Sequence, residues 1–278
     1  MQQSVLYANA NISMQISRSL LTRERIRALS AAENFDAIKS ILAGMDYDTE
    51  LPTDDEIIEA ERAKTLKTAI GLSIEEPVAK CIEILDTRHE IREHLAYKNP
   101  HATSFELDTM SELELFKKLN QYTPKIKNKI IANYFAALAD LTNIKTFAKH
   151  KLAAVAPTGV FVDGGIIAVG RITAAFTGDA DAVKNLFSST PYHAVNVALE
   201  KSLTERNLTI LEDAISKQLD EIVSVGKDDL FKPNLVFWWF VKKQTEFIVI
   251  KTIMVNKRLK MSPVQLREQL RGMYERFN

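Results

Sequence analysis

The amino-acid sequence predicts an all-α protein, and three observations support this fold class. Apolar residues recur at the three- and four-residue spacing of helices through most of the 278 residues. Prolines, glycines and cap-forming residues divide these segments at intervals typical of helices. Sustained alternation of apolar and polar residues, which marks a half-buried strand, is not found. The segment FVDGGIIAV, residues 161–169, is a candidate for one short strand and is too small to change the class.

The longest apolar segment, residues 234–260, is predicted to form one buried helix. It follows Pro233, which the first turn of a helix tolerates, and it contains no Gly or Pro. A membrane-spanning helix needs about 20 largely uncharged residues. Charged residues divide this segment into shorter apolar blocks, among them Lys242, Lys243, Glu246 and Lys251. We therefore expect a helix packed inside the protein against several neighbours rather than a membrane span.

Capping signals set the expected limits of the helices. Helix starts are predicted at residues that accept hydrogen bonds from a first turn or are tolerated within it: Asn34, Thr53, Ser73, Thr109, Thr123, Pro191, Pro233 and Ser262. Helix ends are predicted at Gly44, Gly71, Asn99, Leu152 and Gly226. Thr53 with Glu56, and Ser73 with Glu76, have the spacing of a capping box. Further helices are expected over residues 178–187 and 208–225, and a glycine-rich loop over residues 157–170.

Two internal repeats indicate that the helices form similar units. Residues 140–151 match residues 246–257 at a constant offset of 106, which aligns Asp140 with Glu246 and Lys145 with Lys251. Residues 36–47 match residues 181–192 at an offset of 145, and each segment ends in a tyrosine. The order of long helix, loop, short helix and tyrosine occurs three times, ending the last time at Tyr274. Three similar helical units, or chance similarity between amphipathic helices, would give this pattern.

Four segments, taken in chain order, resemble the C-type subunit family of V-type and archaeal-type ATPases, whose eukaryotic equivalent is the d-type subunit. They are YANANISMQISRSLLT, DLTNIKTFAKHKL, VDGGIIAVG and TEFIVIKTIMVNKRLKMSPVQLREQLRGMY. Asn11 stands where the family usually has an arginine, and Lys232-Pro233-Asn234 replaces a common Gly-Pro. The resemblance implies three helical units, over residues 1–104, 105–203 and 204–278, arranged as a funnel with pseudo-threefold symmetry.

The same resemblance implies a non-catalytic rotor subunit of the central stalk. It would couple the soluble shaft, made of D- and F-type subunits, to the membrane-embedded ring of c- or K-type subunits in a complex that transports H⁺ or Na⁺. It would act as a monomer within that complex, bound peripherally at the cytoplasmic face of a membrane. A helical scaffold or adaptor unrelated to rotary ATPases is the alternative, and an all-α enzyme with a buried site is a third.

Patterns of catalytic, cofactor or metal chemistry are not found in the sequence. His89 and His94 lie five residues apart, which places them about 140° apart around a helix, and the HExxH pattern of zinc enzymes would need a histidine at Glu93. The Asp163-Gly164-Gly165 turn lacks the lysine and the glycine spacing of a phosphate-binding loop. Cys81 has no accompanying nucleophile motif and is interpreted as a small buried apolar residue. We expect no catalytic, cofactor-binding, nucleotide-binding or metal-binding residues.

Composition excludes some classes of partner and compartment. Basic and acidic residues are equal in number, 36 each, which disfavours a general nucleic-acid binder. A single cysteine excludes an intramolecular disulfide and fits a reducing compartment. The first twelve residues lack the basic and apolar regions of a secretory signal. The expected location is therefore the cytoplasm or the cytoplasmic face of a membrane.

Charge is placed unevenly along the chain, and this distribution suggests an interface. Residues 46–61 hold eight acidic residues and no Lys or Arg, whereas residues 242–276 hold nine Lys and Arg and three Glu. We expect one face or end to be acidic and another basic, either as solvated helix faces or as contacts with two partners. The polar residues that the repeat aligns are the candidates for partner contact, or for the packing that shapes it: Asp140, Lys145, Glu246 and Lys251.

Overall fold

A computed structural model describes residues 2–178, 190–225, 227–228, 231–262, 264–266 and 270. Within these ranges the regular elements are twelve α-helices and one 3₁₀ turn, with no strand, so the predicted all-α class is confirmed. The possible strand at residues 161–169 is wrong, because this segment is a loop that leads into a helix. None of the described helices combines the length and the hydropathy that a membrane crossing requires.

The chain forms two compact units, one of residues 1–74 with 226–278 and one of residues 75–225. We call them unit 1 and unit 2. Unit 1 is therefore built from both ends of the chain, while unit 2 is continuous. The threefold arrangement of units over residues 1–104, 105–203 and 204–278 stays a prediction.

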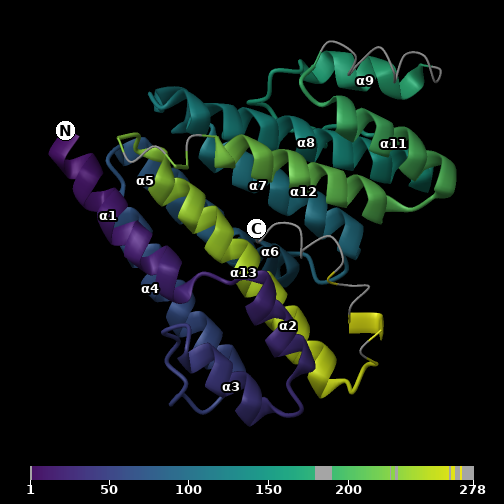
Figure 1. Ribbon diagram of the computed structural model, residues 1–278. Helices are drawn as coiled ribbons and strands as arrows, with labels where there is room; N and C mark the ends of the chain where they lie inside the picture. Colours follow the sequence, from purple (N-terminus) through teal and green to yellow (C-terminus); the bar gives the residue numbers. More distant parts are fainter. Residues whose placement is uncertain are drawn as a thin grey trace. The chain divides into compact units, whose positions relative to one another are not determined.

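Unit 1 is organised around the long C-terminal helix. Its helices are α1 (Gln2–Ser19), α2 (Arg23–Ala31), α3 (Phe35–Ala43), α4 (Asp54–Leu72) and α13 (Asn234–Arg258). Helix α13 packs against α1, α2 and α4 (Figure 1). Ile250 and Ile253 of α13 join the core formed with α2, α3 and α4. Trp238 and Trp239 are buried too, which confirms that residues 234–258 form a helix inside the protein.

Unit 2 is organised around the second long helix. Its helices are α5 (Glu76–Asp86), α6 (Arg88–Lys98), α7 (Ser104–Leu119), α8 (Lys129–Ala153), α9 (Val169–Thr177), α11 (His193–Glu205) and α12 (Leu208–Ser224), with a 3₁₀ turn at Thr123–Lys125. Helix α8 packs against α7, α9, α11 and α12 (Figure 1). Leu141, Ile144 and Phe147 of α8 form the centre of the core with residues of α9, α11 and α12.

Several predicted caps are confirmed. The Asn34 side chain accepts a hydrogen bond from the Ala37 N–H at 2.9 Å, and Gly44 ends α3. Thr53 and Glu56 form the predicted capping box at the start of α4. The Ser262 hydroxyl accepts a hydrogen bond from the Gln265 N–H, as expected for the cap of the last helix. Residues 267–269 and 271–278 of that helix, and residues 179–187, lie outside the described part of the chain.

Other predicted boundaries are wrong for local reasons. Ser73 does not cap a helix, because α5 begins at Glu76 with Pro77 in its first turn. Helix α7 begins at Ser104 rather than after Thr109, since Thr103 and Glu106 form a second capping box. Thr123 opens only a 3₁₀ turn, and α8 starts five residues after Pro124, where the Asn128 side chain accepts hydrogen bonds from two N–H groups. The helix expected up to Asn99 is divided at Thr87 into α5 and α6, and α9 was not predicted.

Candidate functional site: two buried carboxylate clasps

The Asp140 carboxylate is the polar centre of unit 2. It lies in the middle of α8 and is 0% exposed. Its Oδ2 accepts hydrogen bonds from the Ile166 N–H at 3.0 Å and from the Tyr192 hydroxyl at 2.9 Å, and its Oδ1 accepts one from the Ile167 N–H at 3.0 Å. One side chain thus fastens α8 to the loop before α9 and to the residue before α11. We call this arrangement of acid, backbone N–H and tyrosine a clasp.

Unit 1 contains a clasp of the same design around Glu246 of α13. This carboxylate is also 0% exposed. Its Oε2 accepts a hydrogen bond from the Leu21 N–H at 2.6 Å, and its Oε1 accepts one from the Tyr47 hydroxyl at 2.5 Å. The clasp therefore joins the C-terminal long helix to the segment before α2 and to a tyrosine in the turn that follows α3.

The two offsets found in the sequence relate these clasps residue by residue. The offset of 106 aligns Asp140 with Glu246, and the offset of 145 aligns Tyr47 with Tyr192 and Leu21 with Ile166. All of these residues take part in the two clasps. At these positions the two offsets therefore relate equivalent hydrogen-bonding partners in the two clasps.

The glycine-rich loop of unit 2 is shaped by its contact with α8. The Asn143 side chain exchanges two hydrogen bonds with the backbone of Val162, both 2.8 Å long. Gly164 has a φ of +104°, a backbone conformation that residues with a side chain rarely adopt. A Cβ on Gly165 would lie 1.9 Å from Oδ1 of Asp140. The Gly-Gly pair thus lets the backbone of this loop lie directly against a buried acid.

Unit 1 adds a buried cation to its clasp. Lys243 is 0% exposed, and its Nζ lies 2.6 Å from Oε1 of Glu246 and 3.0 Å from Oε1 of Glu61 on α4. Its ammonium also lies over the Tyr47 ring, 4.8 Å from the centroid. A buried charge is costly unless it is paired, so Lys243 depends on both carboxylates. The equivalent position in α8 is Ala137, which leaves the clasp of unit 2 without a cation at this place.

Burial dominates the electrostatics of both clasps. It raises the pKa of Asp140 against the opposing effect of the three hydrogen bonds that Asp140 accepts. It also raises the pKa of Glu246 against the effects of Lys243, Tyr47 and Leu21. Burial, followed by the neighbouring carboxylate, raises the pKa of each clasp tyrosine well above its ordinary value. Because these donors hold their protons tightly, the clasps fasten backbone and helices in place rather than transfer protons.

The four predicted site residues divide into buried acids and exposed lysines. Asp140 and Glu246 are enclosed within their clasps. The Lys145 side chain is 38% exposed and lies 2.6 Å from Glu212 of α12. The Lys251 side chain is 55% exposed and lies 3.9 Å from Asp55 of α4. The lysines are therefore the members of the set that reach the surface, and each contacts an acid on a neighbouring helix rather than the acid on its own helix.

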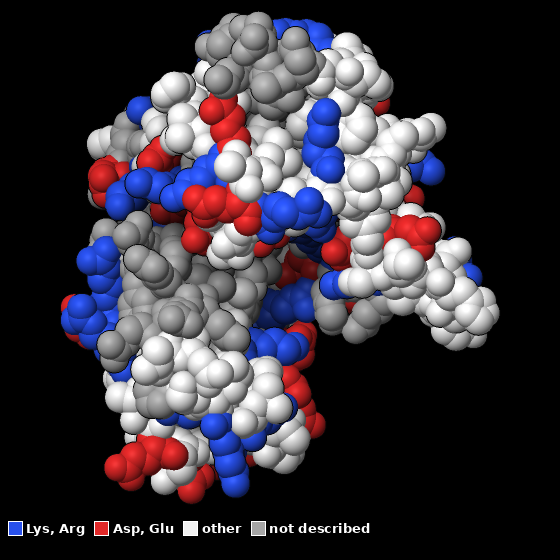
Figure 2. Space-filling view, turned by 90° about the vertical axis from the view of Figure 1, so that its right-hand side faces the viewer, with Lys and Arg blue, Asp and Glu red and all other residues white. Residues whose placement is uncertain are grey.

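The acidic and basic segments of the chain contact each other within unit 1, so the expected opposed faces are wrong for these residues. Arg258 of α13 pairs with Asp54 and, at 3.7 Å, with Asp55. Lys243 pairs with Glu61 of the same acidic segment. Figure 2 shows Lys and Arg side chains lying beside Asp and Glu side chains over the face in view. The two charge runs are adjacent because α4 and α13 pack together.

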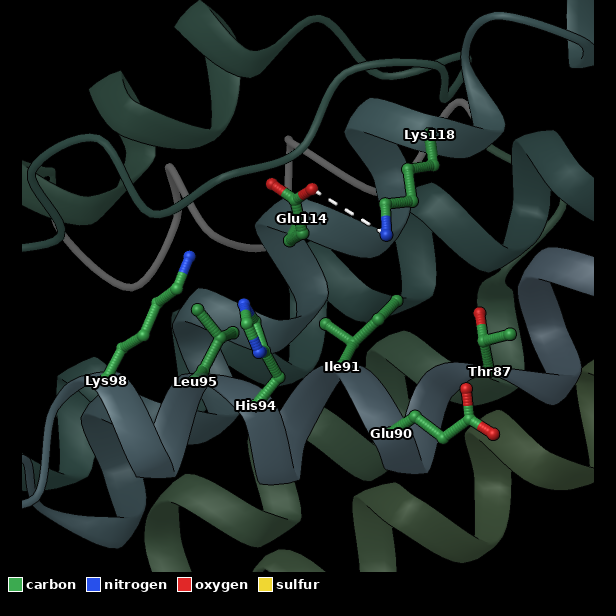
Figure 3. Close-up of a pocket in the computed structure, with 8 residues that line it drawn as sticks. All are labelled: Thr87, Glu90, Ile91, His94, Leu95, Lys98, Glu114 and Lys118. Carbon is green, nitrogen blue, oxygen red and sulfur yellow. Dashed lines mark ion pairs between the residues drawn. The ribbon is translucent and has the colours of Figure 1, made fainter.

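A groove of about 410 Å³ lies between α6 and α7 in unit 2 (Figure 3). Ile91, His94 and Leu95 extend from α6 toward Glu114 and Lys118 of α7. His94 is exposed, and the side chain of His89 lies outside the described part of the structure. In the described part of the chain no group of three or more His, Cys, Asp or Glu could hold a metal ion. Cys81 is buried, and burial raises the pKa of its thiol to about 12, which makes it a poor nucleophile.

The fold and the two clasps together define the class of protein: it is all-helical, and its buried carboxylates hold its own helices and loops together. The chain belongs to the ATP synthase (C/AC39) subunit family, whose sequence pattern it matches over residues 53–269. This family is equivalent to the d-type subunit of V-ATPases, as the resemblance implied, and it is a non-catalytic component of rotary ATPases. A search of curated proteins found no match. A scaffold unrelated to rotary ATPases is therefore the wrong alternative.

Proposed function

We propose that this chain is the central-stalk rotor component that couples the soluble shaft to the membrane-embedded ring of a V-type or A-type ATPase. Family membership over residues 53–269 is the observation that carries the proposal, because it assigns the chain to a rotary ATPase. The proposed partners are the D- and F-type shaft subunits and the c- or K-type ring subunits. The proposed location is peripheral, at the cytoplasmic face of the membrane, and the transported ion is H⁺ or Na⁺.

The clasps supply the rigidity that torque transfer requires. Each acid ties the middle of a long helix to a backbone segment and a tyrosine that are distant in the sequence. Hydrogen bonds to a charged group contribute about 1.5–3 kcal/mol each, and close-packed interiors resist compression. A long helix held in this way transmits force to its neighbours instead of sliding past them.

An exposed stripe on α13 supports a partner contact around Lys251. Ile248 and Val255 of α13 are 57% and 39% exposed, and Leu259, the residue that caps its C-terminal end, is 67% exposed. The spacing of these residues places them along one side, with Lys251 between Ile248 and Val255. Aligned apolar side chains at this spacing are typical of a surface that receives a helix of another protein. In α8 the offset of 106 places Thr142, Lys149 and Ala153 at the three apolar positions. The stripe of large apolar side chains is thus present on α13 and absent from the equivalent positions of α8.

Affinity purification from detergent-solubilised membranes tests the assignment. Tagged chain should bring down the shaft and ring subunits, identified by mass. Recovery of the chain without any ATPase component would contradict the proposed function.

Charge reversal tests the predicted contact residues. Lys145→Glu combined with Lys251→Glu should leave the isolated chain folded and weaken assembly, more strongly at low salt, where exposed charges are least screened. Lys201→Glu, at an exposed α11 lysine that pairs with Glu205, is the matched control. ATP hydrolysis uncoupled from ion transport would place the lysines in the path of torque. Undiminished assembly and coupling in the double variant would remove them from the interface.

A further inference from the structure

Two clasps of matching chemistry in one chain create a problem of pairing. Each uses an acid of a long helix, a tyrosine hydroxyl and a backbone N–H two or three residues before the next helix. Hydrogen bonding alone would let Asp140 accept the donors of unit 1, or Glu246 those of unit 2. Some other feature of the molecule must decide which acid meets which loop.

The first distinguishing feature is steric. The offset of 145 that aligns the clasp donors also aligns Leu20 with Gly165. Since a Cβ at Gly165 would lie 1.9 Å from Oδ1 and 2.6 Å from Cγ of Asp140, a leucine docked at that place would collide with the acid. In unit 1 Leu20 is accommodated with only 9% of its surface exposed. The acid there is glutamate, which has one more methylene group through which to adjust its carboxylate.

The second distinguishing feature is charge. Lys243 lies between Glu246 and Glu61, and both of its ion pairs are buried. If α13 paired with the loop of unit 2, Lys243 would lose Glu61 and remain as a buried cation with one acid fewer. If α8 paired with the loop of unit 1, Ala137 would supply no buried cation for Glu61, which would keep only its pair with the half-exposed Lys64 at 3.2 Å. Removing one partner from a buried ion pair is strongly destabilising, so both exchanges are disfavoured.

The order of the chain makes such discrimination necessary. Tyr47 lies 199 residues from Glu246, its partner, whereas Asp140 comes earlier in the chain and is synthesised first. Tyr192 lies only 52 residues from Asp140. The acid of the wrong unit is therefore synthesised before the helix that carries Glu246, and long-range pairing of this kind is slow.

We infer that Gly165 with Asp140, and Leu20 with Glu246, Lys243 and Glu61, form a pairing code that directs each long helix to its own unit. The code is a property of folding and does not rest on the proposed role in a rotary ATPase. Specificity is a difference between affinities, and here it is produced by a clash and by the loss of the buried Lys243–Glu61 ion pair in the wrong pairings.

A mutant cycle in unit 2 tests the steric half of the code. Gly165→Ala should lower the melting temperature strongly in the wild type, and it should lower it much less in an Asp140→Ala background, where the colliding carboxylate is gone. Gly165→Leu with Asp140→Glu should melt closer to the wild type than Gly165→Leu alone. Melting shifts that simply add in both cycles would overturn the steric code.

Rewriting unit 1 tests discrimination itself. Leu20→Gly with Glu246→Asp and Lys243→Ala gives the loop and the long helix of unit 1 the residues that unit 2 has at these positions. After unfolding in denaturant and dilution, recovery of native monomer should fall several-fold relative to the wild type, with crosslinked peptides joining residues 20–47 to α8. Lys242→Ala, at the adjacent buried lysine, is the control and should keep the wild-type crosslinks to α13. If the rewritten chain recovers as the wild type does, with crosslinks to α13 only, the code does not operate.

Discussion

Gly165→Ala gives the sharpest test of the clasp in unit 2. The added methyl carbon would lie 1.9 Å from Oδ1 of Asp140, far inside a van der Waals contact. Either the loop retreats or the carboxylate turns away, and both displace the hydrogen bonds from the Ile166 and Ile167 N–H groups. At about 1.5–3 kcal/mol for each bond to a charged acceptor, losing these two predicts a destabilisation of about 3–6 kcal/mol. Typical proteins have a total stability of about 5–15 kcal/mol, so this loss is large.

The assay is thermal or urea unfolding, with hydrogen exchange to locate the effect in residues 75–225. Gly170→Ala is the matched control in the same region, because a Cβ at Gly170 meets nothing within 4 Å and the residue lies in the first turn of α9. Alanine is favoured over glycine inside a helix by about 0.5–1 kcal/mol, so the control should be neutral or stabilising. Equal stability of the two variants would refute the close approach of the loop to Asp140.

Three further outcomes are expected from unfolding measurements. Ile250→Asp should lower the free energy of unfolding by several kcal/mol, because it places an unpaired charge at a fully buried position. Lys251→Ala should change stability by about 0.5 kcal/mol or less. If both variants melted like the wild type, the packing of α13 would be contradicted. Thr53→Ala should cost about 1 kcal/mol through loss of the capping box of α4, and Thr53→Ser should restore most of it. Because the pKa of Asp140 is raised, the folded chain holds this proton more tightly than the unfolded chain does. The stability that this group contributes is therefore fully present at pH values below its ordinary pKa of 3.8, and it is lost as pH rises through the raised pKa. The deficit of Asp140→Asn should therefore shrink as pH rises through that window, and a deficit independent of pH would count against the burial of the acid.

Local sequence signals predicted much of the secondary structure. The spacing of apolar residues indicated the helices, and Thr53 with Glu56 indicated the start of α4, because a capping box depends only on residues three apart. The same signal was present at Thr103 and Glu106 and was missed, although it marks the start of α7. The start of α8 also has a local signal in the sequence, because the Asn128 side chain accepts hydrogen bonds from the first turn of this helix.

The sequence selected the acids of the candidate site without the contacts that enclose them, and partner contact at the four predicted residues stays a prediction. The repeat selected Asp140 and Glu246, and it placed Tyr47 and Tyr192 at equivalent positions. The repeat did not predict that each acid contacts a tyrosine, because Tyr47 and Glu246 are 199 residues apart and a sequence period gives no information about contacts between such distant residues. Internal alignment combined with the order of elements was the signal that could have connected them.

By itself the sequence determined the fold class, the family and the recurrence of one design in two places, since each is recorded in residue types at fixed spacing. Only the tertiary structure decided that α13 packs with the N-terminal helices in unit 1. It also decided that Asp140 and Glu246 are buried while Lys145 and Lys251 are exposed. The contact between the acidic segment of α4 and the basic segment of α13 was likewise visible only in the structure. These outcomes depend on which apolar faces bury each other. That choice is made between elements far apart in the chain, where a linear pattern carries no information about the partner.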